Sequence, residues 1–290
     1  MASIPESSKQ TRPCIRGVLV FIALLVVARF VLELAGVSHH STRWLSSSAA
    51  VFLAALYVGA LTSMAGKARW RSLILPAIWL AVWTQAWIIL MTIISAVFRL
   101  ERSHFAESAD YGNWSHLGQH ILGHAIETVA FAVVVLILMT VTHLLRRWPL
   151  AVGPAALLGA LVVIRYWVEA MGTPTTSAAA VSSTLAVLLC AFYLGGVSPG
   201  ASARALFPVS LAIGWAWRFW VFLAVLLSSA SPFYRTHFFD PTKGRVPTRL
   251  LGELISNIIA GFIAGLVIWG IAVWISRAGA RARRVSEAQP

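Results

Sequence analysis

Two pairs of oppositely charged residues lie inside long apolar stretches, where a charged side chain is costly. Arg29 and Glu33 are four residues apart, and Arg165 and Glu169 repeat that spacing. In a helix this spacing places both side chains of a pair on one face. One interpretation is structural, with each arginine reaching toward the outer lipid headgroups. The other is a symmetric pair of binding sites, in which the acids orient the arginines toward an anion.

Arg218 lies near the middle of another apolar stretch, in the segment GWAWRFWVF. At this depth the side chain does not reach water easily, so it needs an anionic partner or aromatic contacts. Glu127 lies at a matching depth in its own stretch, and we predict that it pairs with Arg218. The alternative is that such a pair only fixes the packing of two helices.

Three histidines recur at every fourth residue ahead of Glu127, at His116, His120 and His124. On a helix these four residues form one polar stripe. Histidines at this spacing can share a metal ion, and the glutamate could complete its coordination. The more common meaning of such a stripe is a hydrated helix end, where histidine responds to pH. The sequence therefore assigns no metal and no cofactor.

The stretches that carry these residues define the class of protein. Of 290 residues, 59% are apolar and 11% are charged, whereas about 25% are charged in an ordinary soluble domain. The mean hydropathy is +0.79. These values exclude a soluble enzyme, a disordered chain and a secreted disulfide scaffold. A membrane β-barrel is also excluded, because its strands alternate apolar and polar residues in stretches of about ten.

Eight apolar runs are long enough to cross a hydrocarbon core of about 30 Å as helices. We place them at Gly17–Gly36, Leu45–Ala65, Ser72–Phe98, Leu117–Leu145, Pro149–Met171, Ser177–Gly196, Ala205–Ser229 and Leu250–Ser276. The expected fold is an all-α integral membrane protein with eight transmembrane helices, and the lipid bilayer is its main partner.

The chain also aligns with itself, which indicates an internal duplication. Residues 29–61 match residues 165–197 without a gap, and 12 of the 33 positions are identical. Further on, His104-Phe105 matches His237-Phe238. The second copy has Leu254 and Ile258 where the first has His120 and His124, which argues against a metal or haem shared by both copies.

The alignment predicts two tandem four-helix repeats. Residues 1–147 form the first, with a basic N-terminal arm, and residues 148–290 form the second, with a basic C-terminal tail. Each repeat has an even number of spans, so both enter the membrane in the same direction. We expect a pseudo-two-fold axis along the membrane normal, as in transporters built from parallel repeats.

The loop charges predict the orientation. If the N-terminus is inside, the inner segments hold 13 of the 23 Lys and Arg residues and two of the ten acids. This is the positive-inside bias, so we predict a cell-membrane protein with both termini in the cytoplasm. The basic residues form short clusters beside helices, so membrane insertion and anionic lipid explain them better than nucleic acid does.

The intramembrane polar residues gather in the outer halves of the spans, and we expect them to line an outward-facing cavity. The candidate binding residues are Arg29, Glu33, His120, His124, Glu127, Arg165, Glu169 and Arg218. The first hypothesis is a transporter or channel-like protein for a small anionic solute or lipid headgroup. The second is a non-catalytic subunit, assembly factor or sensor that binds other membrane proteins. The third is an intramembrane enzyme that uses the His/Glu stripe.

Overall fold

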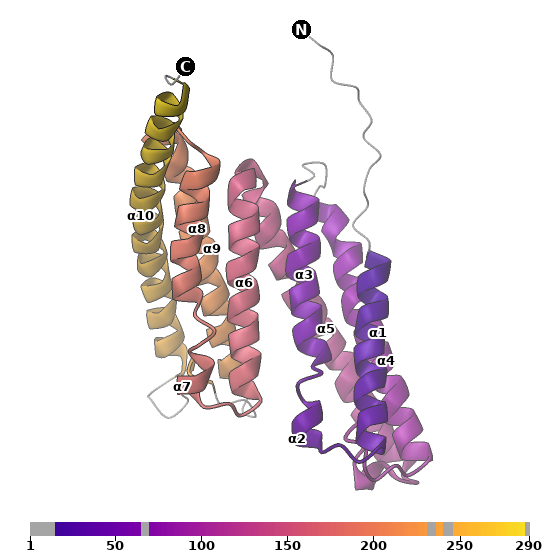
Figure 1. Cartoon of the computed structure of the whole chain (residues 1–290). Helices are drawn as coiled ribbons and strands as arrows, with labels where there is room; N and C mark the ends of the chain where they lie inside the picture. Colours follow the sequence, from indigo (N-terminus) through magenta and orange to yellow (C-terminus); the bar gives the residue numbers. More distant parts are fainter. Residues whose placement is uncertain (1–14, 65–69, 231–235, 240–245, 288–290) are drawn as a thin grey trace, which may run out of the picture. The chain divides into compact units, whose positions relative to one another are not determined.

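The computed structural model describes residues 15–64, 70–230, 236–239 and 246–287, and these residues are almost entirely helical (Figure 1). Within them, eight helical segments are long and apolar enough to cross a membrane. The expectation of an all-helical chain with eight spans is therefore confirmed, and the chain is a multi-pass membrane protein. The chain divides into two compact units, residues 1–139 and residues 140–290. The division falls inside α5 (Trp114–Leu144) rather than after it.

Unit 1 is a bundle in which α1 packs against α3 and α4, and α3 also packs against α4. The ring of Phe52 on α3 stacks on that of Phe131 on α5, with 5.5 Å between centroids. The elements are α1 (Ile15–Leu34), α2 (His39–Thr42), α3 (Ser47–Met64), η1 (Trp70–Leu73), α4 (Ile74–Val97), η2 (Ser108–Asp110) and most of α5.

Unit 2 is built around α9, which packs along α10 and against α6. Gly214 makes the α9–α10 contact possible, since a Cβ atom there would lie 2.5 Å from the carbonyl oxygen of Gly261. Small residues that let helix backbones approach are typical of helix contacts in lipid. The elements are η3 (Leu145–Arg147), α6 (Pro149–Ala170), α7 (Thr175–Ala178), α8 (Ser183–Val197), α9 (Ala203–Ala230) and α10 (Val246–Glu287).

Two of the predicted spans differ from the helices. The sixth, Ser177–Gly196, is broken between α7 and α8, because the side chain of Ser182 accepts a hydrogen bond from the backbone N–H of Leu185 at 3.3 Å and so starts a new helix. The eighth continues past Ser276 to Glu287. Its tail is rich in alanine and arginine, which are strong helix formers.

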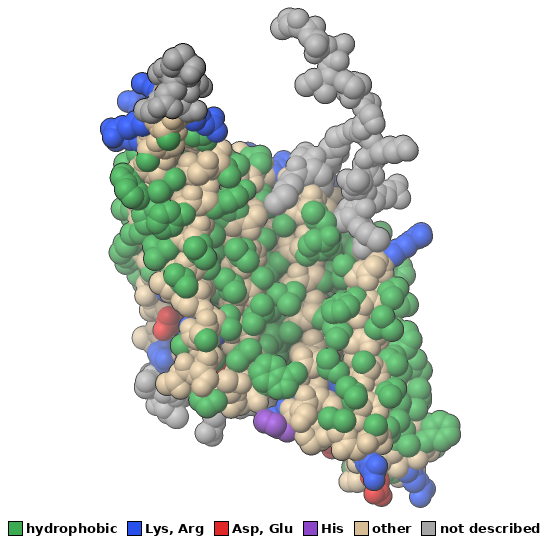
Figure 2. All heavy atoms as spheres, viewed as in Figure 1, with side chains coloured by type: hydrophobic (Ala, Val, Ile, Leu, Met, Phe, Trp, Pro, Cys, Tyr) green, Lys and Arg blue, Asp and Glu red, His purple; other side chains and the backbone are tan. Residues whose placement is uncertain are grey.

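The surface agrees with a lipid environment. Hydrophobic side chains cover the flanks of the helices, and Lys and Arg side chains gather near helix ends (Figure 2). Leu24, Ile126 and Trp274 are each more than 60% exposed. Contiguous apolar surface of this kind is unfavourable in water and expected in a bilayer.

Candidate functional site

Unit 1 has a buried carboxylate at its predicted outer end, the end that carries residues 35–46 and 98–113. Glu33 lies in the last turn of α1, and its side chain is fully buried. The helix ends at Leu34 and is followed by a turn at Gly36, whose φ of +92° suits a residue without a Cβ atom. A carboxylate at a helix C-terminus opposes the helix dipole. Glu33 therefore needs hydrogen-bond donors and positive charge around it.

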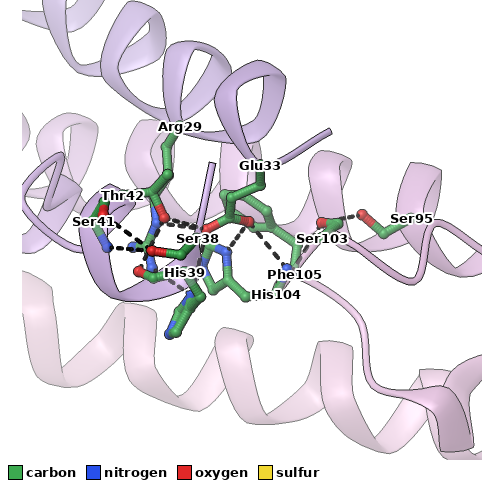
Figure 3. A network of polar contacts seen from close by, with 10 residues as sticks. All are labelled: Arg29, Glu33, Ser38, His39, Ser41, Thr42, Ser95, Ser103, His104 and Phe105. Carbon is green, nitrogen blue, oxygen red and sulfur yellow. Dashed lines mark hydrogen bonds and ion pairs between the residues drawn. The ribbon is translucent and has the colours of Figure 1, made fainter. Parts of the chain in front are cut away.

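Four neighbours surround the two oxygens of Glu33 (Figure 3). Oε1 accepts a hydrogen bond from the Thr42 hydroxyl at 2.6 Å and from Arg29 Nε at 3.4 Å, and Nδ1 of His39 lies 3.4 Å away. Oε2 accepts two bonds from His104, from the backbone N–H at 3.0 Å and from ring Nδ1 at 2.5 Å. The carboxylate thus joins α1 to α2 and to the loop after α4.

Unit 2 contains the same arrangement. Arg165 Nε lies 3.2 Å from Oε1 of Glu169. Oε2 of Glu169 accepts the backbone N–H of His237 at 2.8 Å and its ring Nδ1 at 2.6 Å. We call each set of Arg, Glu and loop His an Arg–Glu–His clamp. Because each clamp holds a loop to a helix end, the two acids have a structural task besides any role in binding.

Contacts beside the clamps also match between the two units. Each clamped loop has a hydroxyl that is hydrogen-bonded to the preceding helix, and an aromatic ring in contact with the helix that carries the clamp. The hydroxyl pairs are Ser95–Ser103 at 2.8 Å and Ser228–Thr236 at 2.7 Å, and the ring pairs are Phe30–Phe105 at 6.0 Å and Tyr166–Phe238 at 6.2 Å.

The unit 1 clamp has two additional residues. The positions that align with His39 and Thr42 are Thr175 and Ala178 in the second copy. Glu33, His39 and His104 each offer one possible metal-ligand atom within 4.8 Å of the others. However, Nη2 of Arg29 lies 3.4 Å from Nδ1 of His39. The guanidinium already supplies the positive charge that a metal ion would bring, so this cluster is better explained as a clamp.

The imidazole of His104 lies in the loop, outside the spans. Burial of the ring and the positive charge of Arg29 lower its pKa to about 4, although the hydrogen bond to Glu33 acts in the opposite direction. His104 is therefore neutral near pH 7. In that state its Nδ1 carries the proton that is donated to Glu33.

A second polar cluster lies on the same loop and on the start of α5. The buried carboxylate of Asp110 contacts two imidazoles, with Oδ1 2.6 Å from Nδ1 of His116 and Oδ2 2.9 Å from Nδ1 of His120. Oδ2 also accepts the backbone N–H of Glu107 at 2.8 Å. Burial acts to raise the pKa of Asp110, but the hydrogen bonds from His116 and His120 outweigh it and lower the pKa below its usual value.

The predicted histidine stripe continues along α5. Nδ1 of His124 lies 3.1 Å from Oε2 of Glu127, and the His124 ring stacks on that of His120 with 5.1 Å between centroids. The Glu127 side chain is 58% exposed. The structure therefore brings His120, His124 and Glu127 together, and it adds Asp110 to them.

Two pockets lie in unit 1. One, of about 120 Å³, is beside Asp110 and is also lined by Arg99, Asn113 and Trp114. The other is an open groove of about 540 Å³ between α1 and α3, lined mainly by apolar side chains and running from Gly17 to Trp44. The outward-facing cavity expected between the repeats stays a prediction.

Arg218 has no close acidic partner among the described residues of unit 2. Its guanidinium lies over the ring of Trp217 at 5.1 Å. Its Nε and the Nε1 of Trp217 are both buried without a hydrogen-bond partner in the described part of the chain. The negative charge of Glu253 on α10 interacts electrostatically with Arg218, but the two described side chains form no ion pair.

The sequence pattern does not identify several residues that belong to the polar clusters of the structure. His39, His104, Asp110 and His237 lie in loops or short helices, where no periodic pattern marks them. The signal for two of them was the repeated His-Phe pair, which identified matching positions but not their contacts. The predicted pair of Glu127 and Arg218 stays a prediction, because these residues belong to different units.

Comparison with known proteins identifies no relative of this chain: no family model, no curated protein and no solved structure matches it.

Proposed function

We propose that this membrane protein is a transporter or channel-like protein that binds an oxyanion, either a small anionic solute or the headgroup of an anionic lipid. The observation that carries this proposal is the buried Nε donor of Arg218, which has no hydrogen-bond partner among the described residues. The other candidate binding residues, Arg29, Glu33, His120, His124, Glu127, Arg165 and Glu169, belong to the predicted outer halves of the same bundles.

Arg218 and Trp217 present two buried N–H donors with no acceptor in the described chain. An unsatisfied buried donor costs about 1–3 kcal/mol, and more when the group is charged. An oxyanion satisfies both donors at once, since arginine binds carboxylate and phosphate with short charge-assisted hydrogen bonds. Arg218 is the sixteenth residue of α9, so it lies about 22 Å along the helix from Ala203. This depth suits a solute that crosses the membrane.

Polar atoms of α10 lie at about the same height in unit 2 as Arg218. The indole N–H of Trp215 donates to the carbonyl of Ile258 at 3.3 Å, which sets the register of α9 against α10. In antiparallel helices this register puts Asn257 within about one turn of Arg218. The side-chain amide of Asn257 donates to the Glu253 carbonyl at 2.7 Å, while its Oδ1 is buried without a partner in the described residues. A protonated or hydroxylated solute group would satisfy that oxygen.

The proposal includes the architecture predicted from the sequence. We propose that residues 1–147 and 148–290 are parallel copies related by a pseudo-two-fold axis, in a cell membrane with both termini in the cytoplasm. The matching Arg–Glu–His clamps support the duplication. In transporters with parallel repeats, the substrate site lies between the repeats near the middle of the bilayer.

The test is binding to the purified chain in detergent. Inorganic phosphate and acetate should raise the thermal unfolding temperature of the wild-type protein, and Arg218→Gln should abolish the shift. Arg204→Gln is the matched control, because Arg204 lies exposed in the first turn of the same helix, away from Arg218. Phosphatidylglycerol in nanodiscs distinguishes a lipid headgroup from a free solute. A chain that responds to none of these anions, or equally in both variants, would contradict the proposal.

One observation favours the second candidate, a non-catalytic subunit. The groove between α1 and α3 is lined in part by the small residues Gly17, Ala50 and Ala54. Small residues let a neighbouring transmembrane helix approach closely. Co-purification of a membrane partner, lost when Ala50 and Ala54 are replaced by leucine, would support that function.

A further inference from the structure

The first turns of α5 carry three histidines whose rings are already oriented. His116, His120 and His124 recur at four-residue spacing, so they share one face of the helix. Each ring uses Nδ1 to contact a carboxylate: that of Asp110 for His116 and His120, and that of Glu127 for His124.

The carboxylate of Asp110 fixes the tautomer of its two imidazoles. An ionised carboxylate only accepts hydrogen bonds, so Nδ1 of each ring carries the proton and Nε2 keeps its lone pair. No described residue forms a hydrogen bond with Nε2 of His116 or His120. Asp110 is itself held in place, because it is buried and accepts the backbone N–H of Glu107.

This arrangement is the one that metal-binding histidines use. A metal-ligating imidazole almost always donates its other N–H to a carboxylate or carbonyl, which fixes the ring and raises the basicity of the ligand atom. Two histidines at positions i and i+4 of a helix have the spacing of known zinc motifs, in which both side chains bind one ion. Asp110 orients both of them through one side chain.

The charge and position of the cluster also suit a cation. Asp110 and Glu127 contribute two negative charges in a chain with a net charge of +13. The span that begins at Trp114 has 34 residues, or about 51 Å of helix, which exceeds a hydrocarbon core of about 30 Å. The first turns therefore extend beyond the lipid tails, and the side chains of His116 and His120 are 39% and 25% exposed.

The second copy shows that these histidines are not needed to build the helix. The positions that align with His116, His120 and His124 are Leu250, Leu254 and Ile258, all within the continuous helix α10. The clamp residues, by contrast, are present in both copies. Helix formation therefore does not account for the three histidines of the first copy.

We propose that the start of α5 binds one divalent transition-metal ion of the Zn²⁺ or Cu²⁺ class through Nε2 of His116 and His120, with Asp110 as the carboxylate that orients both rings. Water or an exchangeable ligand fills the remaining positions, as at metal sites that keep open coordination. This site lies in unit 1 and is independent of the oxyanion proposed at Arg218.

The test is metal binding to the full-length protein after removal of any polyhistidine tag. Zn²⁺ affinity is measured by competition with a chromophoric chelator, and nitrogen coupling in the electron paramagnetic resonance spectrum of the Cu²⁺ form counts the bound imidazoles. We expect two nitrogens. His116→Leu and His120→Leu should each raise Kd at least about tenfold, and Asp110→Asn, which removes the orienting carboxylate, should raise it about 10–100-fold.

The control is His40→Leu, an exposed histidine outside the cluster, which should leave Kd within about threefold of wild type. If a leucine variant does not fold, as judged by circular dichroism, the glutamine variants His116→Gln and His120→Gln replace it. Unchanged affinity in the His116/His120 double variant, or equal losses in His40→Leu, would overturn the proposal.

Discussion

Glu33 binds one residue of a distant loop twice: His104 donates its backbone N–H at 3.0 Å and its ring Nδ1 at 2.5 Å to the same carboxylate oxygen. The two residues are 71 positions apart in the chain. Glu169 and His237 form the same pair of bonds at 2.8 and 2.6 Å. A loop is thus held to a helix end in each half of the chain.

Removing the negative charge of Glu33 should weaken the attachment of the loop that carries His104 to the end of α1. Glu33→Gln keeps the side-chain shape but turns one acceptor into a donor that faces other donors. Hydrogen bonds to charged groups contribute about 1.5–3 kcal/mol each, so we expect a loss of about 2–3 kcal/mol in the free energy of unfolding in detergent. Glu101→Gln, in an exposed position of the same loop, is the control and should change little. Equal stability of the two variants would show that the clamp does not hold the loop.

The attachment of the loop should weaken in mild acid. The pKa of His104 is lowered from 6.5 to about 4, so the detached loop, with an ordinary histidine, binds more protons between these two values. Attachment is therefore fully stable above about pH 6.5 and is progressively lost as the pH falls toward 4. Hydrogen exchange of the His104 amide, corrected for its intrinsic rate, should show less protection at pH 5 than at pH 7. Equal protection at both values would contradict this.

The α9–α10 contact should not tolerate a methyl group at Gly214. A Cβ atom there would lie 2.5 Å from the Gly261 carbonyl oxygen and 2.6 Å from the Gly265 nitrogen. Overpacking of this kind costs about 1–3 kcal/mol, so Gly214→Ala should lower the unfolding temperature. Gly270→Ala on α10 has open space around its Cβ atom and should be neutral or stabilising, because alanine favours a helix. A loss of the same size in both variants would exclude a close backbone contact.

Both termini should be accessible only from the cytoplasm. Single cysteines at Ser7 and Ser286, in a Cys14→Ser background, should react with a membrane-impermeant maleimide only after the cells are permeabilised. The remaining cysteine, Cys190, is buried and should not interfere. Labelling of either position in intact cells would refute the predicted orientation.

The eight spans were predictable because hydropathy alone requires them. An apolar run of about 20 residues has few structures open to it in lipid except a helix. The ends of the spans were less predictable, since Ser182 breaks one helix through a local side-chain hydrogen bond, and the alanine- and arginine-rich tail extends another.

The sites were predictable only where residues share a helix. The spacing of Arg29 and Glu33, and that of the α5 histidines, follows from helix geometry. The contacts of His104 and Asp110 depend on how a loop folds back, and loops carry no periodic signal. The alignment of the two copies identified His104 and His237 as equivalent without showing that each binds a glutamate.

The most direct test of the central claim, an oxyanion at Arg218, is a crystal structure of the protein grown in a lipid mesophase with selenate and measured at the selenium edge. We predict an anomalous peak, or the phosphate of a bound lipid, within about 2.7–3.2 Å of Arg218 Nε and Trp217 Nε1, and its loss in Arg218→Gln. A map that shows no anion within hydrogen-bond distance of Arg218 Nε, with that donor satisfied instead by the carboxylate of Glu253, would contradict the account.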